Sequence, residues 1–169
     1  MHTTAVHLAK LGWVRIRPLR NGETETVARL FDRLSDQSRV RRFNAAKPRL
    51  TELELATLAR IDARRHSLVA WVDGDPEPAG FAQLVRDTDE RTRAEIAFAV
   101  ADVYHSRGIG SALVDQLAAD ARAAGVTHLT AMIQSSNTAA FVLVRRVARP
   151  VDVRFEGGEA SIVAALLAA

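Results

Sequence analysis

The chain has 169 residues, of which 48% are hydrophobic and 25% charged, and this composition is typical of a single globular domain with one core. It contains no cysteine, which excludes disulfides, a thiol nucleophile and a cysteine-ligated zinc site. The formal net charge of +3, with only 5% aromatic residues, favours an anionic small ligand or an acidic protein partner over nucleic acid.

The N-terminus carries no pattern of a targeting segment. Its first twelve residues, MHTTAVHLAKLG, lack both a basic leader and a continuous apolar core. No run of about 18 apolar residues predicts a transmembrane helix. We therefore expect a partly ordered tail over residues 1–12, one domain over residues 13–169, a cytoplasmic location and no membrane partner.

A strand and three helices are predicted for the first third of the chain. Residues 13–19 alternate apolar and basic side chains, as a half-buried strand does. A helix begins near Asn21, and its apolar residues recur at helical spacing. A second, short helix over residues 35–43 has Ser35 as a plausible N-cap. The third follows a capping-box motif that opens with Thr51.

The second of these helices carries three arginines, Arg39, Arg41 and Arg42. Two interpretations are open at this point. The arginines form a solvated helix face, or they form a basic lip for an anionic substrate or a phosphate group.

From residue 66 the pattern changes to strands. Three strands, over residues 66–72, 79–86 and 93–100, are separated by turn sequences and predict an antiparallel meander. His66 is a lone histidine at the start of the first strand, and we expect it to have a structural role.

A long helix is predicted over residues 108–124, with Gly125 at its C′ position. A buried strand over residues 126–133 follows it, so this strand and the one before the helix should be parallel. The remaining predicted elements are a helix and a two-stranded hairpin, over residues 138–147, 150–155 and 160–167.

The most informative stretch is AEIAFAVADVYHSRGIGS, which runs from residue 94 to residue 111. Glu95 opens its strand, and a glycine-rich turn from Arg107 to Ser111 leads into the long helix. Such a turn presents bare backbone N–H groups to a phosphate, and glycine at positions 108 and 110 lets the phosphate approach closely. An acid on the same strand suggests chemistry beside the phosphate.

Two common nucleotide sites fit this turn poorly. A dinucleotide fingerprint needs a third small residue where Leu113 stands, and an acid where Gln134 follows the next strand. The lysine of a phosphate-binding P-loop is absent as well. What remains is a pyrophosphate bound by successive N–H groups, with no metal needed.

The segment VYHSRGIGSALVDQLAADARAAG resembles the acyl-coenzyme A signature of the GNAT N-acetyltransferase superfamily. A nearer resemblance is to the acetyltransferase domain of bacterial Pat-type protein lysine acetyltransferases, and it is carried by VRIRPLRNGE, RLSDQSRVRRF and AEIAFAV. The resemblance implies an α/β fold with a mixed, mostly antiparallel sheet of six or seven strands. This sheet would be splayed between strands four and five and flanked by about four to five helices.

The same resemblance implies acetyl-CoA as co-substrate, no metal, and direct transfer of an acetyl group to a primary amine, in the first place a protein lysine. Glu95 would be the general base. Positions that would bind the coenzyme are Phe98, Val100, Arg107, Gly108, Ile109, Gly110, Ser111 and Asn137. The chain would act as a monomer or homodimer.

Several alternatives stay open. The acceptor could be a small amine, or the chain could be a catalytically weak acyl-CoA-binding regulatory module. From the residues alone, Glu95 is equally a surface acid paired with Arg93 or Arg91, and Asn137 is also a helix N-cap.

Two positions depart from the family pattern. His105 stands where the signature usually has arginine or glutamine, and we expect coenzyme binding to survive because backbone groups dominate there. Phe141 lies where many members place a tyrosine as the acid for the leaving thiolate. The only tyrosine, Tyr104, is expected to be a packing residue.

Overall fold

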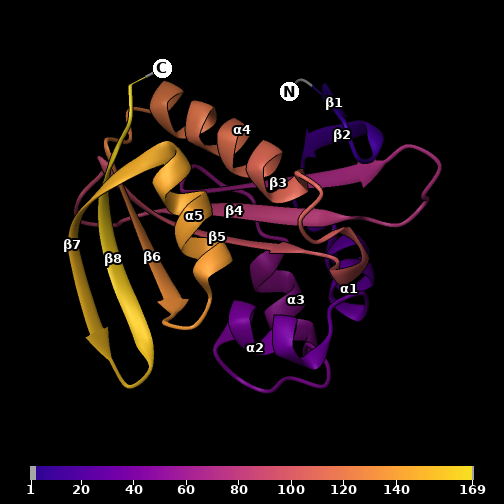
Figure 1. The fold of residues 1–169 in the computed structure, drawn as a ribbon, viewed down its shortest axis with the longest axis horizontal. Coiled ribbons are helices and arrows are strands. Elements are labelled where there is room, and N and C mark those ends of the chain that lie inside the picture. Colours follow the sequence, from indigo (N-terminus) through magenta and orange to yellow (C-terminus); the bar gives the residue numbers. More distant parts are fainter. Residues whose placement is uncertain (1–2, 169) are drawn as a thin grey trace.

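The computed structural model describes residues 3–168 and forms one eight-stranded sheet with helices on both faces (Figure 1). In chain order the strands are β1 (Thr4–Leu8), β2 (Gly12–Pro18), β3 (Arg65–Val72), β4 (Gly80–Arg86), β5 (Arg93–Val100), β6 (His128–Gln134), β7 (Ala148–Glu156) and β8 (Glu159–Leu166). The helices are α1 (Thr24–Asp32), α2 (Asp36–Phe43), α3 (Glu52–Leu58), α4 (Ile109–Ala123) and α5 (Thr138–Val147), with a short 3-10 turn over Asp102–Tyr104.

The strand order is β1-β2-β3-β4-β5-β6-β8-β7, and only β5 and β6 pair in parallel. This confirms the predicted mixed, mostly antiparallel α/β fold. The sheet has eight strands, not six or seven, because the segment expected to be a tail contains β1. That strand pairs antiparallel with β2, from Thr4 opposite Ile16 to Leu8 opposite Gly12. Residues 1 and 2 of the expected tail lie outside the described residues.

The parallel pair is short, and the sheet opens immediately beyond it. β5 and β6 are paired only where Arg93–Glu95 lie opposite His128–Thr130. The second half of β5 therefore has no partner on its β6 side. Because β1 was not among the predicted strands, β5 and β6 are the predicted strands four and five, and the predicted splay between them is confirmed. In Figure 1 the hairpin of β7 and β8, together with β6, diverges from the other strands at this point.

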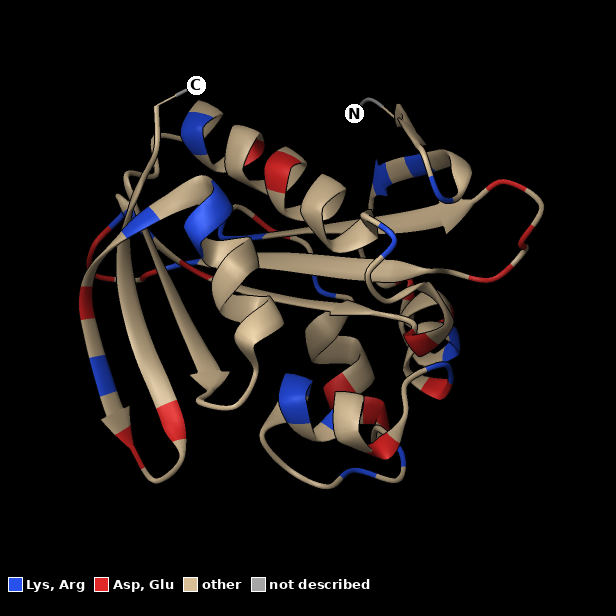
Figure 2. Ribbon diagram, viewed as in Figure 1, with Lys and Arg blue, Asp and Glu red and all other residues tan. Residues whose placement is uncertain are grey.

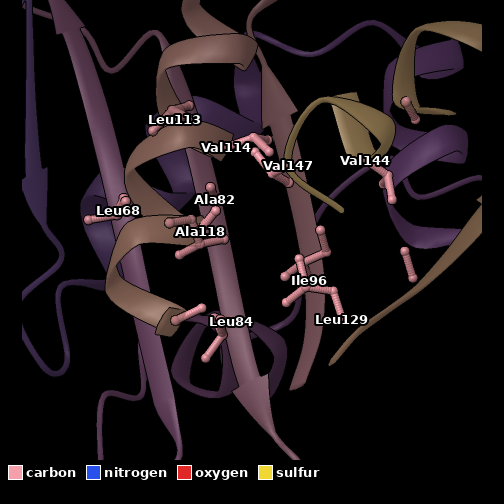
Figure 3. Packing of buried hydrophobic residues seen from close by; sticks show 14 of the residues in the cluster. Leu68, Ala82, Leu84, Ile96, Leu113, Val114, Ala118, Leu129, Val144 and Val147 are labelled. Atoms are coloured by element: carbon pink, nitrogen blue, oxygen red, sulfur yellow. The ribbon is translucent and has the colours of Figure 1, made fainter. Parts of the chain in front are cut away.

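One face of the sheet is covered by α4 and α5. Figure 3 shows Leu113 and Ala118 of α4 over the sheet near Leu68 and Ala82, while Val114 lies beside Val147 of α5. The helix lies very close to β4, since a Cβ atom at Gly80 would be 2.8 Å from Leu113 Cδ1. Glycine at this position therefore lets the helix pack directly on the sheet.

The opposite face is covered by α1, α2 and α3, which lie on the other side of the sheet from α4 (Figure 1). A second apolar cluster joins α1 and the C-terminal end of α3 to the sheet. Its buried members are Leu19, Val27, Leu30, Ala59, Val69, Phe81 and Ala101. Within residues 3–168 no helix has the length and apolar character needed to cross a membrane.

The local signals at the helix ends are confirmed. The Ser35 side chain accepts a hydrogen bond from the Ser38 backbone N–H, as an N-cap does. Thr51 opens a complete capping box at α3. Gly125 follows α4 with φ +79°, the left-handed conformation that favours glycine at C′.

Candidate active site

The glycine turn leaves backbone donors free at the start of α4. Gly108 is the N-cap, with φ +100° and no side-chain cap, and Ala112 donates the first helical hydrogen bond, to Gly108 O at 3.0 Å. The N–H groups of Ile109, Gly110 and Ser111 precede that bond, so they have no carbonyl within the helix. Together with the positive end of the helix dipole, they make a site suited to a phosphate.

Gly110 is needed for a second reason that the sequence did not indicate. A Cβ atom at this position would lie 3.0 Å from Leu143 Cδ1 of α5 and 3.7 Å from Val100 Cγ2 of β5. The missing side chain thus allows the first turn of α4 to sit between α5 and the end of β5. This contact holds the phosphate end of the site in place.

A cavity of about 480 Å³ begins at this turn, between the end of β5, the start of α5 and α2. Six of the predicted coenzyme-binding residues line it: Phe98, Val100, Gly108, Gly110, Ser111 and Asn137. Arg107 is exposed and outside the cavity wall, while the Ile109 side chain is completely buried in the core. For Ile109, therefore, only backbone groups remain available to a ligand at the turn.

Asn137 combines two features at the head of α5. Its side-chain oxygen accepts a hydrogen bond from the Ala140 backbone N–H at 3.3 Å, so it is the N-cap of the helix. It also lines the cavity of about 480 Å³. The cap orients the amide at the cavity wall.

Glu95 lies in a second cavity, of about 350 Å³, on the face of the sheet covered by α2 and α3. Its side chain is exposed, and its neighbours on the adjacent strands are the uncharged Val85 and Thr130. Within residues 3–168 no cation lies close enough to Glu95 to form an ion pair, and Arg93 is paired instead with Glu90 at 3.1 Å. The surface ion pair considered for Glu95 is therefore not formed.

Arg42 joins the two cavities, because it lines both of them. The residue is half-buried, and its guanidinium lies 4.9 Å from the centre of the Phe43 ring. Burial lowers the pKa of Arg42 to about 10, and the negative charge of Glu95 opposes that effect. Arg42 is thus a cation at neutral pH. Figure 2 shows the basic positions of α2, which lies below β5 in this view.

The three arginines of α2 differ in their roles, and neither interpretation of the sequence describes all of them. Arg39 stacks 4.5 Å above the Phe31 ring and donates a hydrogen bond to Pro48 O at 3.1 Å, so it holds α2 in place. Arg41 lines only the larger of the two cavities. No local pattern in the sequence distinguishes Arg42 from the other two, because its place depends on how α2 packs on β5.

The expectation that Tyr104 is a packing residue is confirmed. Its hydroxyl donates a hydrogen bond to Asp75 Oδ2 at 2.6 Å, and the same oxygen is paired with Arg33 at 2.8 Å. Burial, followed by the bond to Asp75, raises the pKa of Tyr104. Phe141 stacks on Phe155 with ring centres 6.5 Å apart. The chain therefore offers no free phenol at either position.

His105 lines the cavity of about 480 Å³ and interacts with the end of β5. Its Nε2 lies 2.9 Å from Val100 O, which fixes the side chain against the carbonyl of a predicted coenzyme-binding residue. The imidazole therefore supports the shape of the connection between β5 and α4.

A third cavity, of about 500 Å³, lies away from both, beside the C-terminal half of α4. His66 lies in its wall, with Nε2 2.7 Å from Asp120 Oδ2, which supports the expected structural role. Arg64, another wall residue, donates both of its bonds to Arg86 O. Among residues 3–168, no group of three or more His, Cys, Asp or Glu side chains is arranged to hold a metal ion.

Comparison with known proteins agrees with this geometry. The sequence pattern of the acetyltransferase (GNAT) family matches residues 13–146. Acetyltransferase Pat from Mycolicibacterium smegmatis is 31% identical over 128 residues, which are 75% of this chain but only 38% of that protein. This chain therefore spans well under half the length of that relative.

Two solved structures extend the likeness to the whole fold. The GNAT domain of S. lividans PAT superimposes with a TM-score of 0.86 at 26% identity, covering 97% of each chain. An acetyltransferase structure from Salmonella typhimurium with its cofactor acetyl-CoA has a TM-score of 0.63 at 19% identity, covering 90% of this chain and 92% of that one. This chain belongs to the acetyltransferase (GNAT) family.

Proposed function

We propose that this chain transfers an acetyl group from acetyl-CoA to the side-chain amine of a protein lysine, with Glu95 as the general base. The observation that carries the proposal is that two cavities beside β5 share a wall residue. The cavity of about 480 Å³ has the glycine turn at its phosphate end. The cavity of about 350 Å³ contains Glu95, and Arg42 lines both.

The parts of the coenzyme would follow one another along β5, from the glycine turn beyond its end back toward Glu95. Gly108 to Ser111 would hold the pyrophosphate, with Arg107 contributing its backbone, and Asn137 would contact the coenzyme from α5. Phe98 and Val100 would hold the pantetheine arm through the backbone that the splay leaves unpaired. The acetyl thioester would then lie near the junction at Arg42, facing the cavity of Glu95.

The chemistry at that junction needs a base more than an acid. A lysine amine has a reference pKa of about 10.4, so it is protonated at neutral pH and must lose a proton before it can attack. Glu95 would accept that proton directly or through one water molecule. Since the chain has no cysteine to carry the acyl group, the amine would attack the thioester directly in a ternary complex.

A protein lysine is the proposed acceptor for two reasons. The first is the likeness to the GNAT domain of S. lividans PAT and to acetyltransferase Pat. The second is the exposure of the Glu95 side chain, which leaves the base accessible to an amine on a large substrate.

The test is release of free thiol from acetyl-CoA with a panel of protein and small amines. We expect Glu95→Gln to bind the coenzyme like the wild type and to lose turnover by about 10²-fold or more, the usual scale for a general base. Glu54→Gln is the matched control, since Glu54 lines the same cavity but is paired with Lys47. Glutamine also retains the capping box there.

Three results would change the proposal. Equal rates for the wild type and Glu95→Gln would remove Glu95 from the mechanism. Turnover with small amines alone would replace the protein lysine by a small acceptor. Coenzyme binding without any turnover would favour an acyl-CoA-binding regulatory module.

A further inference from the structure

Arg42 is the only residue, among those the structure describes, that lines both the coenzyme cavity and the cavity of Glu95. Its guanidinium forms no hydrogen bond or ion pair with the described part of the chain, and its near contact is the Phe43 ring at 4.9 Å. Arg39, three residues earlier, by contrast stacks on Phe31 and donates a hydrogen bond to Pro48 O. Because Arg42 lies in the walls of both cavities, its charge is available where they adjoin.

A half-buried guanidinium in such a place calls for an anionic partner. Removing a cation from water is costly unless a negative charge or hydrogen bonds compensate for it. Burial among largely apolar walls accordingly lowers the pKa of Arg42 to about 10, which still leaves it protonated at neutral pH. The cation is therefore available to a negative charge that comes with a ligand or appears during a reaction.

We propose that Arg42 stabilises the negative charge that forms on the coenzyme A sulfur when the thioester is cleaved. This inference rests on the proposed function for the identity of the reaction. In that reaction Glu95 first takes one proton from the lysine ammonium and passes it to solvent. The neutral amine nitrogen then forms a bond to the thioester carbon and gives its second proton to the Glu95 carboxylate. The carbon–sulfur bond breaks, and its electron pair remains on the sulfur as a thiolate.

The charge balance explains why one arginine serves both cavities. Before the reaction the negative charge is on the Glu95 carboxylate. After proton transfer and cleavage, Glu95 is neutral and the charge is on the thiolate. Because Arg42 borders both places, it faces one negative charge at the start of the reaction and one at the end.

The same role explains how the chain works without a tyrosine acid. The Tyr104 hydroxyl is already bonded to Asp75 at 2.6 Å, and position 141 holds a phenylalanine. An arginine does not give up its proton near neutral pH, so Arg42 stabilises the thiolate by charge alone and does not protonate it.

The other charged and titratable groups near the two cavities are bonded to other residues or line only one of the cavities. Glu54, from α3, is paired with Lys47, and His105 is held at Val100 O. Arg41 lines the coenzyme cavity but not the cavity of Glu95. Arg93, on the same strand as Glu95, is paired with Glu90, and His128 lies opposite it on β6. Arg42 is thus the cation placed to act on the sulfur.

The deciding experiment titrates the thiol of bound coenzyme A by its ultraviolet thiolate absorbance. In the Arg42→Gln variant we expect the bound thiol to ionise about 1 pH unit or more above its value in the wild type, because a neighbouring cation favours the thiolate. Arg42→Lys keeps the charge and should titrate close to the wild type. Arg41→Gln is the matched control, and it should leave the thiol titration unchanged even if it weakens coenzyme binding.

Kinetics give the second readout. Arg42→Gln should lower kcat with acetyl-CoA by about 10²-fold, the scale seen when one preorganised electrostatic contact is removed, and Arg42→Lys should recover part of it. Identical thiol titrations in all four proteins would overturn the inference. So would a higher KM for acetyl-CoA in Arg42→Gln with kcat unchanged, because Arg42 would then only bind the coenzyme.

The two proposals fail in different ways. If the wild type turns over no amine, the proposed function fails, while the thiol titration of bound coenzyme still decides the place of Arg42. If Glu95→Gln loses turnover but the titrations do not depend on Arg42, the proposed base stands and the inference about Arg42 falls.

Discussion

The two ends of the candidate site are built from different parts of the chain. The phosphate end consists of backbone at the start of α4, where Gly108 has φ +100° and Gly110 lies against Leu143. The acceptor end consists of charged side chains from separate elements, with Glu95 on β5 and Arg42 on α2. One end therefore depends on the path of the main chain, and the other depends on charge.

The two ends also differ in how they are supported. Helix α4 carries six buried residues and lies on the sheet in the larger apolar cluster. Helices α2 and α3, which frame the acceptor end, have no buried residue, and α3 is tied to the chain before it by the ion pair between Lys47 and Glu54. Apolar packing thus fixes the end proposed to bind the coenzyme. The end proposed to meet the acceptor is held by polar contacts and partly buried side chains.

The largest effect outside the acceptor end is expected from Gly108→Ala. An alanine at φ +100° costs about 1–2 kcal/mol, so the turn will relax and redirect the first N–H groups of α4. We expect the redirected N–H groups to weaken the affinity for acetyl-CoA roughly tenfold, which corresponds to about 1.4 kcal/mol of binding free energy. The affinity is measured by calorimetric titration. The effect is not steric, since the added Cβ would lie at an ordinary 3.4 Å from Leu8 Cδ1.

Gly125→Ala is the matched control for this change. Gly125 also has a positive φ, of +79°, and a Cβ there would meet nothing within 4 Å. It lies at the other end of α4, far along the helix from the turn. The variant should lose stability like Gly108→Ala but keep its affinity for acetyl-CoA. Equal losses of affinity in both variants would show that the turn has no special role.

The fold was predictable wherever local chemistry determines it. The N-cap at Ser35, the capping box at Thr51 and the C′ glycine at position 125 each depend on a few adjacent residues. β1 was not predictable in the same way. Its five residues form a strand because they pair with β2 across the turn at Gly12, and such pairing adds long-range contacts to a weak local pattern.

In the candidate site, too, features set by local sequence were predictable and features set by packing were not. The glycine turn was readable because a positive φ and a close backbone approach both require glycine. The place of Arg42 was not readable, because neighbouring arginines of the same short helix carry the same local signal. The burial of the Ile109 side chain was readable as well, because the residue belongs to the apolar stripe of the long helix.

A smaller effect is expected from acid, because two glutamates at helix starts are held by ion pairs. The hydrogen bond from Arg17 is the main cause that lowers the pKa of Glu23, at the start of α1, to about 2. The bond from Lys47 likewise lowers the pKa of Glu54 to about 2. Because both folded-state pKa values are depressed, their stabilisation is complete above about pH 4.5 and is lost as the pH falls toward 2.

Arg17→Met tests this at one pair. The variant should be less stable than the wild type by about 1 kcal/mol at pH 7, and the difference should shrink toward zero near pH 2. Urea unfolding followed by tryptophan fluorescence is suitable, since Arg17 stacks 4.5 Å from the Trp71 ring. Loss of that stacking alone would give a difference that stays constant with pH, which would contradict the assignment to Glu23.

The smallest effect is expected from His105→Ala, at the position where the family signature usually has arginine or glutamine. The imidazole bonds to Val100 O at 2.9 Å and is exposed, so its removal costs one hydrogen bond, worth about 1 kcal/mol or less in net terms. If the phosphate end is made of backbone, affinity for acetyl-CoA should change by less than about fivefold. A larger loss in His105→Ala than in Gly108→Ala would mean that a side chain, and not the main chain, dominates binding at that end.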